Sequence, residues 1–189
     1  MRGDDEMRID RSFTFPAARY RIGRVCRASM FALLAAWVSL SSAATNDSAE
    51  KFLADALQDG RAEIQTCELA LKSSHEPAVQ AFAKRMIQDH QAMNDKIVAL
   101  AKQKGYRLPD ELTLTQRATY TALKPLSGHA FDSLFMKHNL SDHESDIKLF
   151  SDQAIHASDE DVRALAGDGL ATLREHLQLA RQTDAALKK

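Results

Sequence analysis

Four ionisable side chains interrupt sequence repeats that otherwise predict apolar helix faces. The clearest is His90, which falls in a repeat spaced alternately by four and three residues: Val79, Ala83, Met86, His90, Met93, Ile97 and Leu100. Glu63, His143 and His176 occupy the same kind of position in three other repeats. Imidazole suits Zn, Fe, Cu or Ni, and a carboxylate supplies charge. Glu63, His90, His143 and His176 are therefore the candidate ligands of a single transition-metal site, provided that the helices bring them together.

A second interpretation needs no metal. Burying an imidazole without a hydrogen-bond partner costs about 1–3 kcal/mol, so His90 requires a partner of some kind. A buried hydrogen-bonded network, in which Glu63 accepts protons from histidine, meets this requirement as well. Four carboxylates flank the histidines and are candidates to orient neighbouring side chains: Asp89, Asp142, Glu144 and Glu175. Both interpretations stay open from the sequence.

Other kinds of chemistry find no support in the sequence. No serine or cysteine lies in a nucleophile motif, and no glycine-rich loop follows a strand pattern to hold phosphate. Four further histidines fall near predicted turns or helix ends, or off the repeats: His75, His129, His138 and His156. Cys67 lies on an apolar repeat, and we expect it to be buried and inert. We therefore assign no catalytic or cofactor-binding residues and do not expect an enzyme.

Four long helices must position the candidate ligands. The chain has only 7 Gly and 4 Pro, and it is rich in residues that favour helices. The repeats predict helices from Asp47 to about Ser73, from Pro77 to about Lys104, from after Ser127 to about His156, and onward from a cap at Ser158. Pro77 suits a first helical turn and Gly105 a helix end. Each candidate ligand then lies near the middle of its helix.

The connection over residues 105–126 is too long for a tight antiparallel turn. It has the length of a crossover along a bundle, and residues 114–123 within it form a predicted short helix. The sequence thus predicts an all-α, ferritin-like four-helix bundle with one long crossover connection. We expect its core to contain Phe82, Met86, Ile97, Leu140, Ile147, Phe150 and Leu173.

The N-terminal residues 1–44 resemble a cleaved export signal. Arginines precede an apolar run from Met30 to Leu40, and small residues follow it up to Ala44. A membrane span needs about 20 apolar residues, and this run is shorter. We therefore expect a bundle of residues 45–189 without a transmembrane span, located in the periplasm and open to association with the outer membrane.

Charge divides unevenly between these two parts. Residues 1–44 carry a formal charge of +3, and the remainder carries −4. No basic stripe remains after residue 44, so nucleic acid is not an expected partner. A protein or envelope partner and a homo-oligomer are both compatible with the sequence.

Four stretches of the chain resemble a bacterial exported family of ferritin-like bundles known as domain of unknown function 4142. These stretches are AEIQTCELAL, PAVQAFAKRMIQDH, FDSLFMKHNLSDHE and LREHLQLA, within about residues 50–187. The residues that recur in the family fall here on Glu63, Asp89-His90, Asp142-His143-Glu144 and Glu175-His176. The resemblance implies a four-helix bundle and export, and it implies no established activity.

The sequence departs from ferritin-like di-iron proteins at the positions that matter for iron. Gln65 stands where a second carboxylate often follows Glu63, and Ile87 and Leu173 stand three residues before His90 and His176. A di-iron centre needs carboxylates at such positions, so a single metal or none is expected. Two hypotheses follow: a non-enzymatic stress or envelope-associated protein, or a metal-binding and redox-active bundle with one Glu/His3 site.

Overall fold

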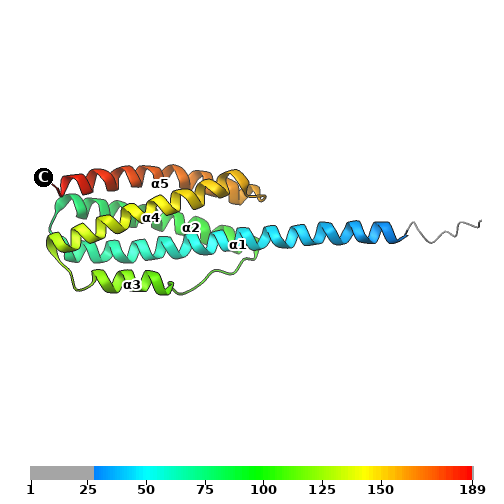
Figure 1. The fold of residues 1–189 in the computed structure, drawn as a ribbon, viewed down its shortest axis with the longest axis horizontal. Coiled ribbons are helices and arrows are strands. Elements are labelled where there is room, and N and C mark those ends of the chain that lie inside the picture. The colour runs from blue at the N-terminus through cyan, green and yellow to red at the C-terminus, as the bar shows by residue number, and fades with distance from the viewer. Residues whose placement is uncertain (1–27, 189) are drawn as a thin grey trace, which may run out of the picture. The chain divides into compact units, whose positions relative to one another are not determined.

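A computed structural model describes the backbone of residues 28–188 and the side chains of residues 48–188. Five helices and no strand occur in this described range. They are α1 (Ala28–Ser73), α2 (Pro77–Lys104), α3 (Leu114–Leu123), α4 (Gly128–His156) and α5 (Glu160–Ala186) (Figure 1). The expectation of an all-α fold is confirmed.

The chain divides into two compact units, residues 1–39 and 40–189. Of the first unit, the structure describes only the helical backbone from Ala28 onward. The expected export signal therefore lies largely outside the described residues. Helix α1 begins at Ala28 rather than at the predicted Asp47, because no Gly or Pro interrupts the sequence between Ala28 and Asp59.

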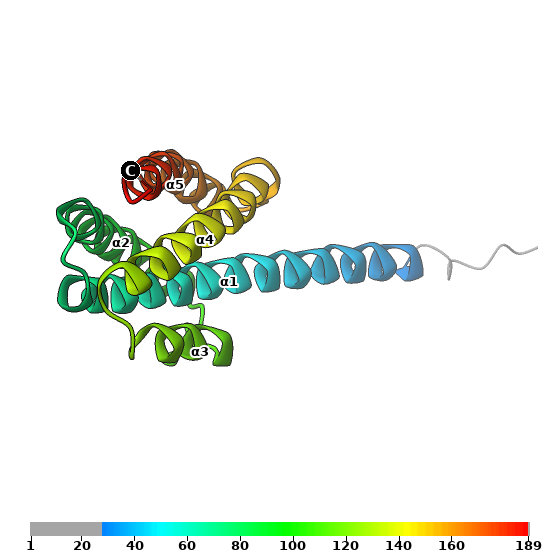
Figure 2. The same ribbon diagram turned by 60° about the vertical axis from the view of Figure 1, so that its left-hand side comes forward.

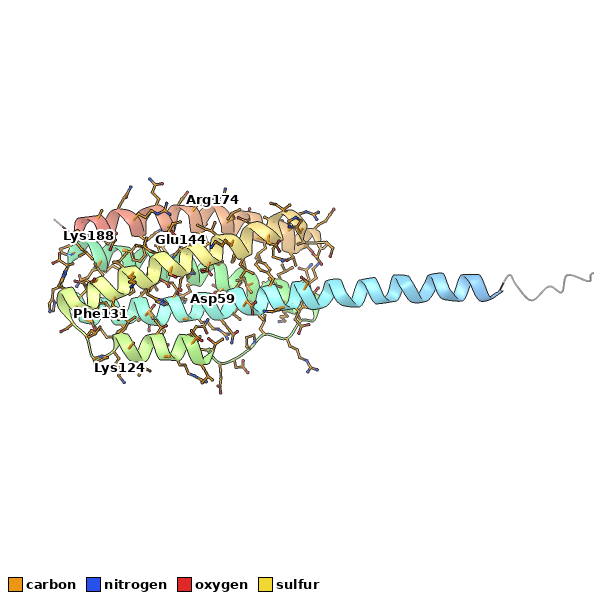
Figure 3. All side chains as sticks on the ribbon, viewed as in Figure 1. Asp59, Lys124, Phe131, Glu144, Arg174 and Lys188 are labelled. Atoms are coloured by element: carbon orange, nitrogen blue, oxygen red, sulfur yellow. The ribbon has the colours of Figure 1, made fainter. Side chains whose placement is uncertain are left out.

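In the second unit, α1, α2, α4 and α5 lie side by side, and α3 lies outside them on the side opposite α5 (Figures 1 and 2). Short turns join α1 to α2 and α4 to α5, so the helices of each pair are antiparallel. Residues 105–127 lead from α2 to α4 and contain α3, as the sequence predicted for a crossover. The charged side chain of Arg174 projects from the outside of α5, and Lys188 follows the end of that helix (Figure 3).

Helix ends follow local chemistry at three positions. Pro77 is the first residue of α2, and Gly105 ends α2 in the left-handed conformation with a φ of 74°. The predicted cap at Ser158 is wrong by one residue. Asp159 is the N-cap of α5, because its carboxylate accepts hydrogen bonds from the backbone N–H groups of Asp161 and Val162.

Helix α3 is fixed to α1 by polar contacts of the crossover segment. The Gln116 side-chain amide donates a hydrogen bond of 2.7 Å to Asp59, and Gln58 donates one of 2.7 Å to the carbonyl of Glu111. A capping box between Thr113 and Gln116 begins α3. The crossover thus places the polar face of α3 over α1 and α4, where it forms one wall of a cavity described below.

The apolar core forms two separate clusters along the bundle. The first contains Phe52 and Phe150, whose rings pack edge to face with centroids 5.1 Å apart. The second contains Phe82 and Phe135, with centroids 6.1 Å apart in the same geometry. Along each of the four long helices, the candidate ligand lies between the residues of one cluster and those of the other. A polar layer therefore crosses the middle of the bundle.

Five of the seven predicted core residues are buried: Phe82, Met86, Ile97, Phe150 and Leu173. Leu140 and Ile147 are only partly buried, so the prediction was wrong in degree for these two. The buried line of α4 runs through Met136, Asn139, His143 and Phe150 instead. Leu140 and Ile147 lie at its edge, where they still pack against the clusters.

Two glycines of α5 provide a matched test of this packing. A Cβ at Gly169 would lie 2.5 Å from the ring of Phe150, whereas a Cβ at Gly167 would meet nothing within 4 Å. We expect Gly169→Ala to lower the free energy of unfolding by about 1–3 kcal/mol, because the Phe52–Phe150 pair cannot move without strain. Gly167→Ala should instead raise it by up to about 1 kcal/mol through helix propensity. Urea denaturation measures both, and equal effects of the two substitutions would contradict the packing described.

Candidate metal centre

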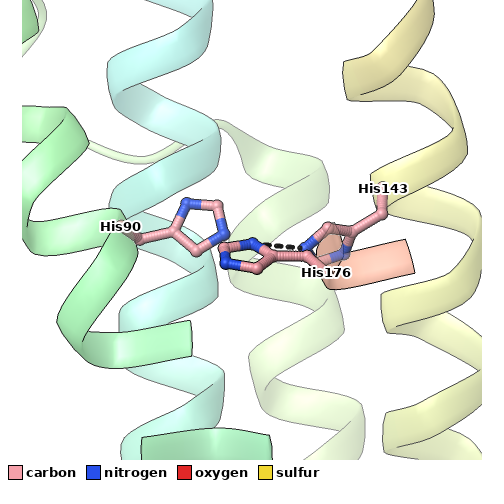
Figure 4. Close-up of side chains that lie close together, drawn as sticks. All are labelled: His90, His143 and His176. Carbon is pink, nitrogen blue, oxygen red and sulfur yellow. Dashed lines mark hydrogen bonds between the residues drawn. The ribbon is translucent and has the colours of Figure 1, made fainter. Parts of the chain in front are cut away.

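Three of the four predicted ligands meet in the polar layer. His90 comes from α2, His143 from α4 and His176 from α5, and their rings point toward one another (Figure 4). One ring nitrogen of each histidine lies within 4.8 Å of a ring nitrogen of the other two. The ring centroids are 5.3–5.7 Å apart. This is the one such group of three or more potential metal-binding side chains among the described residues.

The three imidazoles are held neutral by their surroundings. His90 is 3 % exposed, and His143 and His176 are each 1 % exposed. Burial is the main cause that lowers the pKa of each ring, and at His90 the neighbouring imidazoles lower it further. A neutral imidazole has a lone pair on one nitrogen, which is the form that binds metal.

Hydrogen bonds outside the group decide which nitrogen of His143 carries the proton. Its Nδ1 lies 2.9 Å from the backbone carbonyl oxygen of Asn139. A carbonyl oxygen only accepts hydrogen bonds, so Nδ1 is the donor and carries the hydrogen. The other nitrogen, Nε2, therefore presents a lone pair to the interior of the group.

A carboxylate determines which ring nitrogen of His176 carries the proton. Its Nε2 lies 2.9 Å from Oδ2 of Asp89. Burial alone would raise the pKa of Asp89, but hydrogen bonds from His176 and Arg85 outweigh burial and hold that pKa below its usual value. Asp89 is thus ionised and accepts, so Nε2 of His176 is the donor and Nδ1 presents a lone pair.

The two lone pairs face each other across a short gap. Nε2 of His143 and Nδ1 of His176 are 3.4 Å apart, the contact drawn as a dashed line in Figure 4. With both outer hydrogen bonds made, neither of these nitrogens has a hydrogen to donate to the other. Two nitrogens that bind one tetrahedral metal at about 2.0–2.1 Å lie about 3.3 Å apart. The observed spacing is therefore that of two ligands of one ion.

His90 completes the group without any hydrogen bond of its own. Both of its ring nitrogens are buried and neither has a hydrogen-bond partner among the described residues. Each unsatisfied nitrogen costs about 1–3 kcal/mol. A cation bound between the three rings would give one of these nitrogens a partner.

Glu63 lies outside this group. Its carboxylate accepts a hydrogen bond of 3.4 Å from Sγ of Cys67 and lines a different cavity, beside Asp59 and His138. Helix α1 turns this face toward α3 and α4 rather than toward the three histidines. Cys67 is buried, as expected, and burial raises the pKa of its thiol well above the usual value, so the thiol stays protonated.

Only one of the four flanking carboxylates contacts a histidine of the group. Asp89 does so, and its partner is His176 rather than the adjacent His90. The others bind elsewhere: Asp142 pairs with His138, Glu144 with Arg181, and Glu175 with Arg85. A residue next to an inward-facing one points about 100° away around the helix, so it reaches a neighbouring helix.

Asp89 also connects the group to the surface. Its side chain is 18 % exposed and lines a cavity of about 150 Å³ together with Arg85, Met93 and Thr172. His176 is therefore one hydrogen bond away from solvent. The sequence marked Asp89 only as a neighbour of His90, and the contact across helices could not be read from it.

A second group of polar side chains lies together in the structure and was not predicted from the sequence as a group. Asp59, His138, Asp142 and Asp146 line the same cavity as Glu63. Their spacing carried a signal, because Asp59 and Glu63 are four residues apart and so are His138, Asp142 and Asp146 in turn. Residues four apart lie on one helix face.

Within the described residues, no helix is long and apolar enough to cross a membrane.

Comparison with known proteins supports the fold and the family. No significant match to a curated protein is found. A solved structure, the crystal structure of a DUF305 fragment from Deinococcus radiodurans, matches with a TM-score of 0.64 and 14 % sequence identity, over 75 % of this chain and 95 % of that one. The family described as Domain of unknown function (DUF4142) matches residues 37–183. The chain therefore belongs to the family of domain of unknown function 4142.

Proposed function

We propose that the protein binds one transition-metal ion between His90, His143 and His176. The observation that carries this proposal is the pair of lone pairs on His143 and His176, 3.4 Å apart and fixed by outer hydrogen bonds. His90 adds a third nitrogen that no hydrogen bond satisfies. A bound cation is the partner that suits all three nitrogens at once.

The donor set indicates the class of metal. Three neutral imidazoles favour borderline ions such as Zn, Cu, Ni or Fe over Mg or Ca, which prefer oxygen. Three protein ligands leave at least one coordination position for water or another ligand. No carboxylate lies in the group itself, which argues against a di-iron centre and agrees with the absence of the Glu-x-x-His pattern at His90 and His176.

The alternative of a hydrogen-bonded network is less well supported. That interpretation required Glu63 to accept protons from the histidines, and Glu63 faces another cavity. Among the described residues, the His90 ring makes no hydrogen bond at all. A purely hydrogen-bonded network would leave both ring nitrogens of His90 without a partner.

We also propose that the chain is exported to the periplasm and acts there without catalysing a reaction, as a protein of stress or envelope physiology. The support is the sequence of residues 1–44, with arginines before the apolar run from Met30 to Leu40. This proposal is independent of the metal site, and each can fail without the other.

Substitution of His90 tests the metal site with opposite signs in two conditions. In metal-free protein, His90→Leu should raise the free energy of unfolding by about 1–3 kcal/mol, because it removes two unsatisfied buried nitrogens. With Zn²⁺ at 100 times the dissociation constant, the wild type should gain about 2.7 kcal/mol and the variant nothing. Elemental analysis should find one ion per wild-type chain.

His156→Ala is the matched control, because His156 is exposed and pairs only with Asp152. It should bind metal and respond to chelator as the wild type does. Equal stabilisation of the wild type and His90→Leu by Zn²⁺ would show that the metal binds elsewhere.

The pH dependence of stability in metal-free protein follows from the lowered pKa of His90. Unfolded histidine takes up a proton near pH 6.5, whereas folded His90 stays neutral to much lower pH. The unfolded state then binds more protons than the folded state below pH 6.5. The free energy of unfolding therefore falls as the pH drops below that value. Between about pH 7 and 5, the wild type should lose stability relative to His90→Leu. Parallel curves for the two proteins would contradict the burial of a neutral His90.

Export makes a separate prediction. Protein recovered from the periplasm should begin near Thr45, because a signal peptidase cleaves after small residues such as Ala44. N-terminal sequencing of the exported protein measures this directly. Recovery of Arg24 or Phe31 in the mature protein would show that the segment is retained.

A further inference from the structure

The histidine group is buried, so a metal ion needs a route to reach it. His90, His143 and His176 are each no more than 3 % exposed. The outer partner of His143 is the backbone carbonyl of Asn139, a residue without exposed surface. His90 has no hydrogen-bond partner among the described residues. Neither of these two rings therefore has a polar contact that leads to solvent.

His176 differs from the other two rings because its outer partner reaches the surface. Nε2 of His176 lies 2.9 Å from Oδ2 of Asp89, and the Asp89 side chain is 18 % exposed. Arg85 donates a hydrogen bond to the same oxygen, Oδ2. Oδ1 of Asp89 makes no hydrogen bond among the described residues. One oxygen of this carboxylate thus holds the histidine, and the other is available to a cation.

Asp89 also lines a cavity of about 150 Å³ between α2 and α5. Arg85, Lys96 and Asp168 at this cavity are exposed, so it opens to solvent. Each water molecule occupies about 30 Å³, so the cavity has room for an ion that keeps several of its waters. The remaining lining residues are small, apolar or hydroxyl side chains: Ala92, Met93, Leu165, Gly169 and Thr172.

Met93 forms the most adaptable part of this cavity wall. It is partly buried and packs against the apolar cluster that contains Phe150. It lies three residues after His90, so the two side chains share a face of α2. Its Cε lies 3.6 Å from the position of a Cβ at Gly169, so the missing side chain of Gly169 leaves it space. Methionine has three rotatable bonds and can change its shape without movement of the helices.

The polar cavity beside Glu63 has no comparable connection to the histidines. It contains Asp142, the residue before His143, but Asp142 pairs with His138 at 2.9 Å. The two ring nitrogens of His143 face the Asn139 carbonyl and His176 instead. No hydrogen bond among the described residues therefore joins that cavity to the histidine group, whereas Asp89 joins the cavity between α2 and α5 to it.

We propose that metal ions enter and leave the histidine group through the cavity between α2 and α5, with Asp89 as the first protein ligand that an incoming ion meets. This proposal rests on the proposed function, because it concerns the route to that metal site. The carboxylate attracts a cation from solvent, and its contact with His176 brings the cation beside the group. Arg85 opposes entry, because its positive charge lies against Asp89.

A larger side chain in the cavity tests this route through the kinetics of binding. Thr172→Leu narrows the cavity and removes no metal ligand. A narrower route raises the barrier in both directions, so association and dissociation of Co²⁺ should each slow by about tenfold while the dissociation constant stays unchanged. Stopped-flow absorption measures both rates, because the visible spectrum of Co²⁺ changes when nitrogen ligands replace water. Ala171→Leu is the matched control, because Ala171 is exposed and lies outside the cavity. It should leave both rates unchanged.

Removal of the positive charge at the entrance gives a second measurement. Arg85→Gln should raise the association rate of Co²⁺ by about threefold at low ionic strength, and salt should reduce this difference because it screens exposed charges. Arg174→Gln removes the same charge from the outside of α5, where the side chain projects away from the bundle (Figure 3). It should leave the association rate unchanged.

Equilibrium titration with Co²⁺ separates failure of the route from failure of the metal site. If the wild type binds no Co²⁺, the proposed function is wrong and the route is wrong with it. If the wild type binds one Co²⁺ per chain and Thr172→Leu leaves both rates unchanged, the route alone is wrong. Slower association together with weaker equilibrium binding would show that the substitution disturbs the ligands, which would also overturn the route. Ala92→Leu fills the same cavity from α2 and replaces Thr172→Leu if circular dichroism shows that the latter does not fold.

Discussion

The bundle is organised around the need to hold three neutral imidazoles in its interior. His90, His143 and His176 lie in a layer between two apolar clusters, and each cluster contains an edge-to-face phenylalanine pair. One pair joins α4 to α1 on one side of the layer, and the other joins α4 to α2 on the other side. Close packing of this kind on both sides of the layer holds the three rings at one depth. Outer hydrogen bonds to Asn139 and Asp89 then turn the lone pairs inward.

Helix α4 separates two kinds of polar chemistry. His143 faces α2 and α5, whereas Asp142 and Asp146 face α1 and α3. This division follows from helix geometry, because adjacent residues point about 100° apart around the axis. The interior side offers neutral nitrogen donors that are buried, and the other side offers carboxyl groups that line a polar cavity.

Much of the fold could be predicted from the sequence because it depends on local rules. Helix propensity, apolar repeats of four and three, Pro77 at a helix start and Gly105 at a helix end are all local, and they predicted α2, α3 and α4 to within a residue or two. The crossover followed from the length of residues 105–126. The interruption of three repeats by histidine was also readable, because an ionisable residue on an apolar face requires a partner. Leu140 and Ile147 were predicted to be buried, but both are only partly buried, at the edge of the buried line of α4.

The sequence by itself determined which helices form and that His90, His143 and His176 face their interior. Only the tertiary structure decided that these three meet while Glu63 joins Asp146 and its neighbours in a separate cavity. The reason is that a repeat fixes the direction of a side chain relative to its own helix, to within the width of an apolar face. The rotation of α1 about its axis, and the placement of α3 against it, are set by packing between helices, which no single helix encodes.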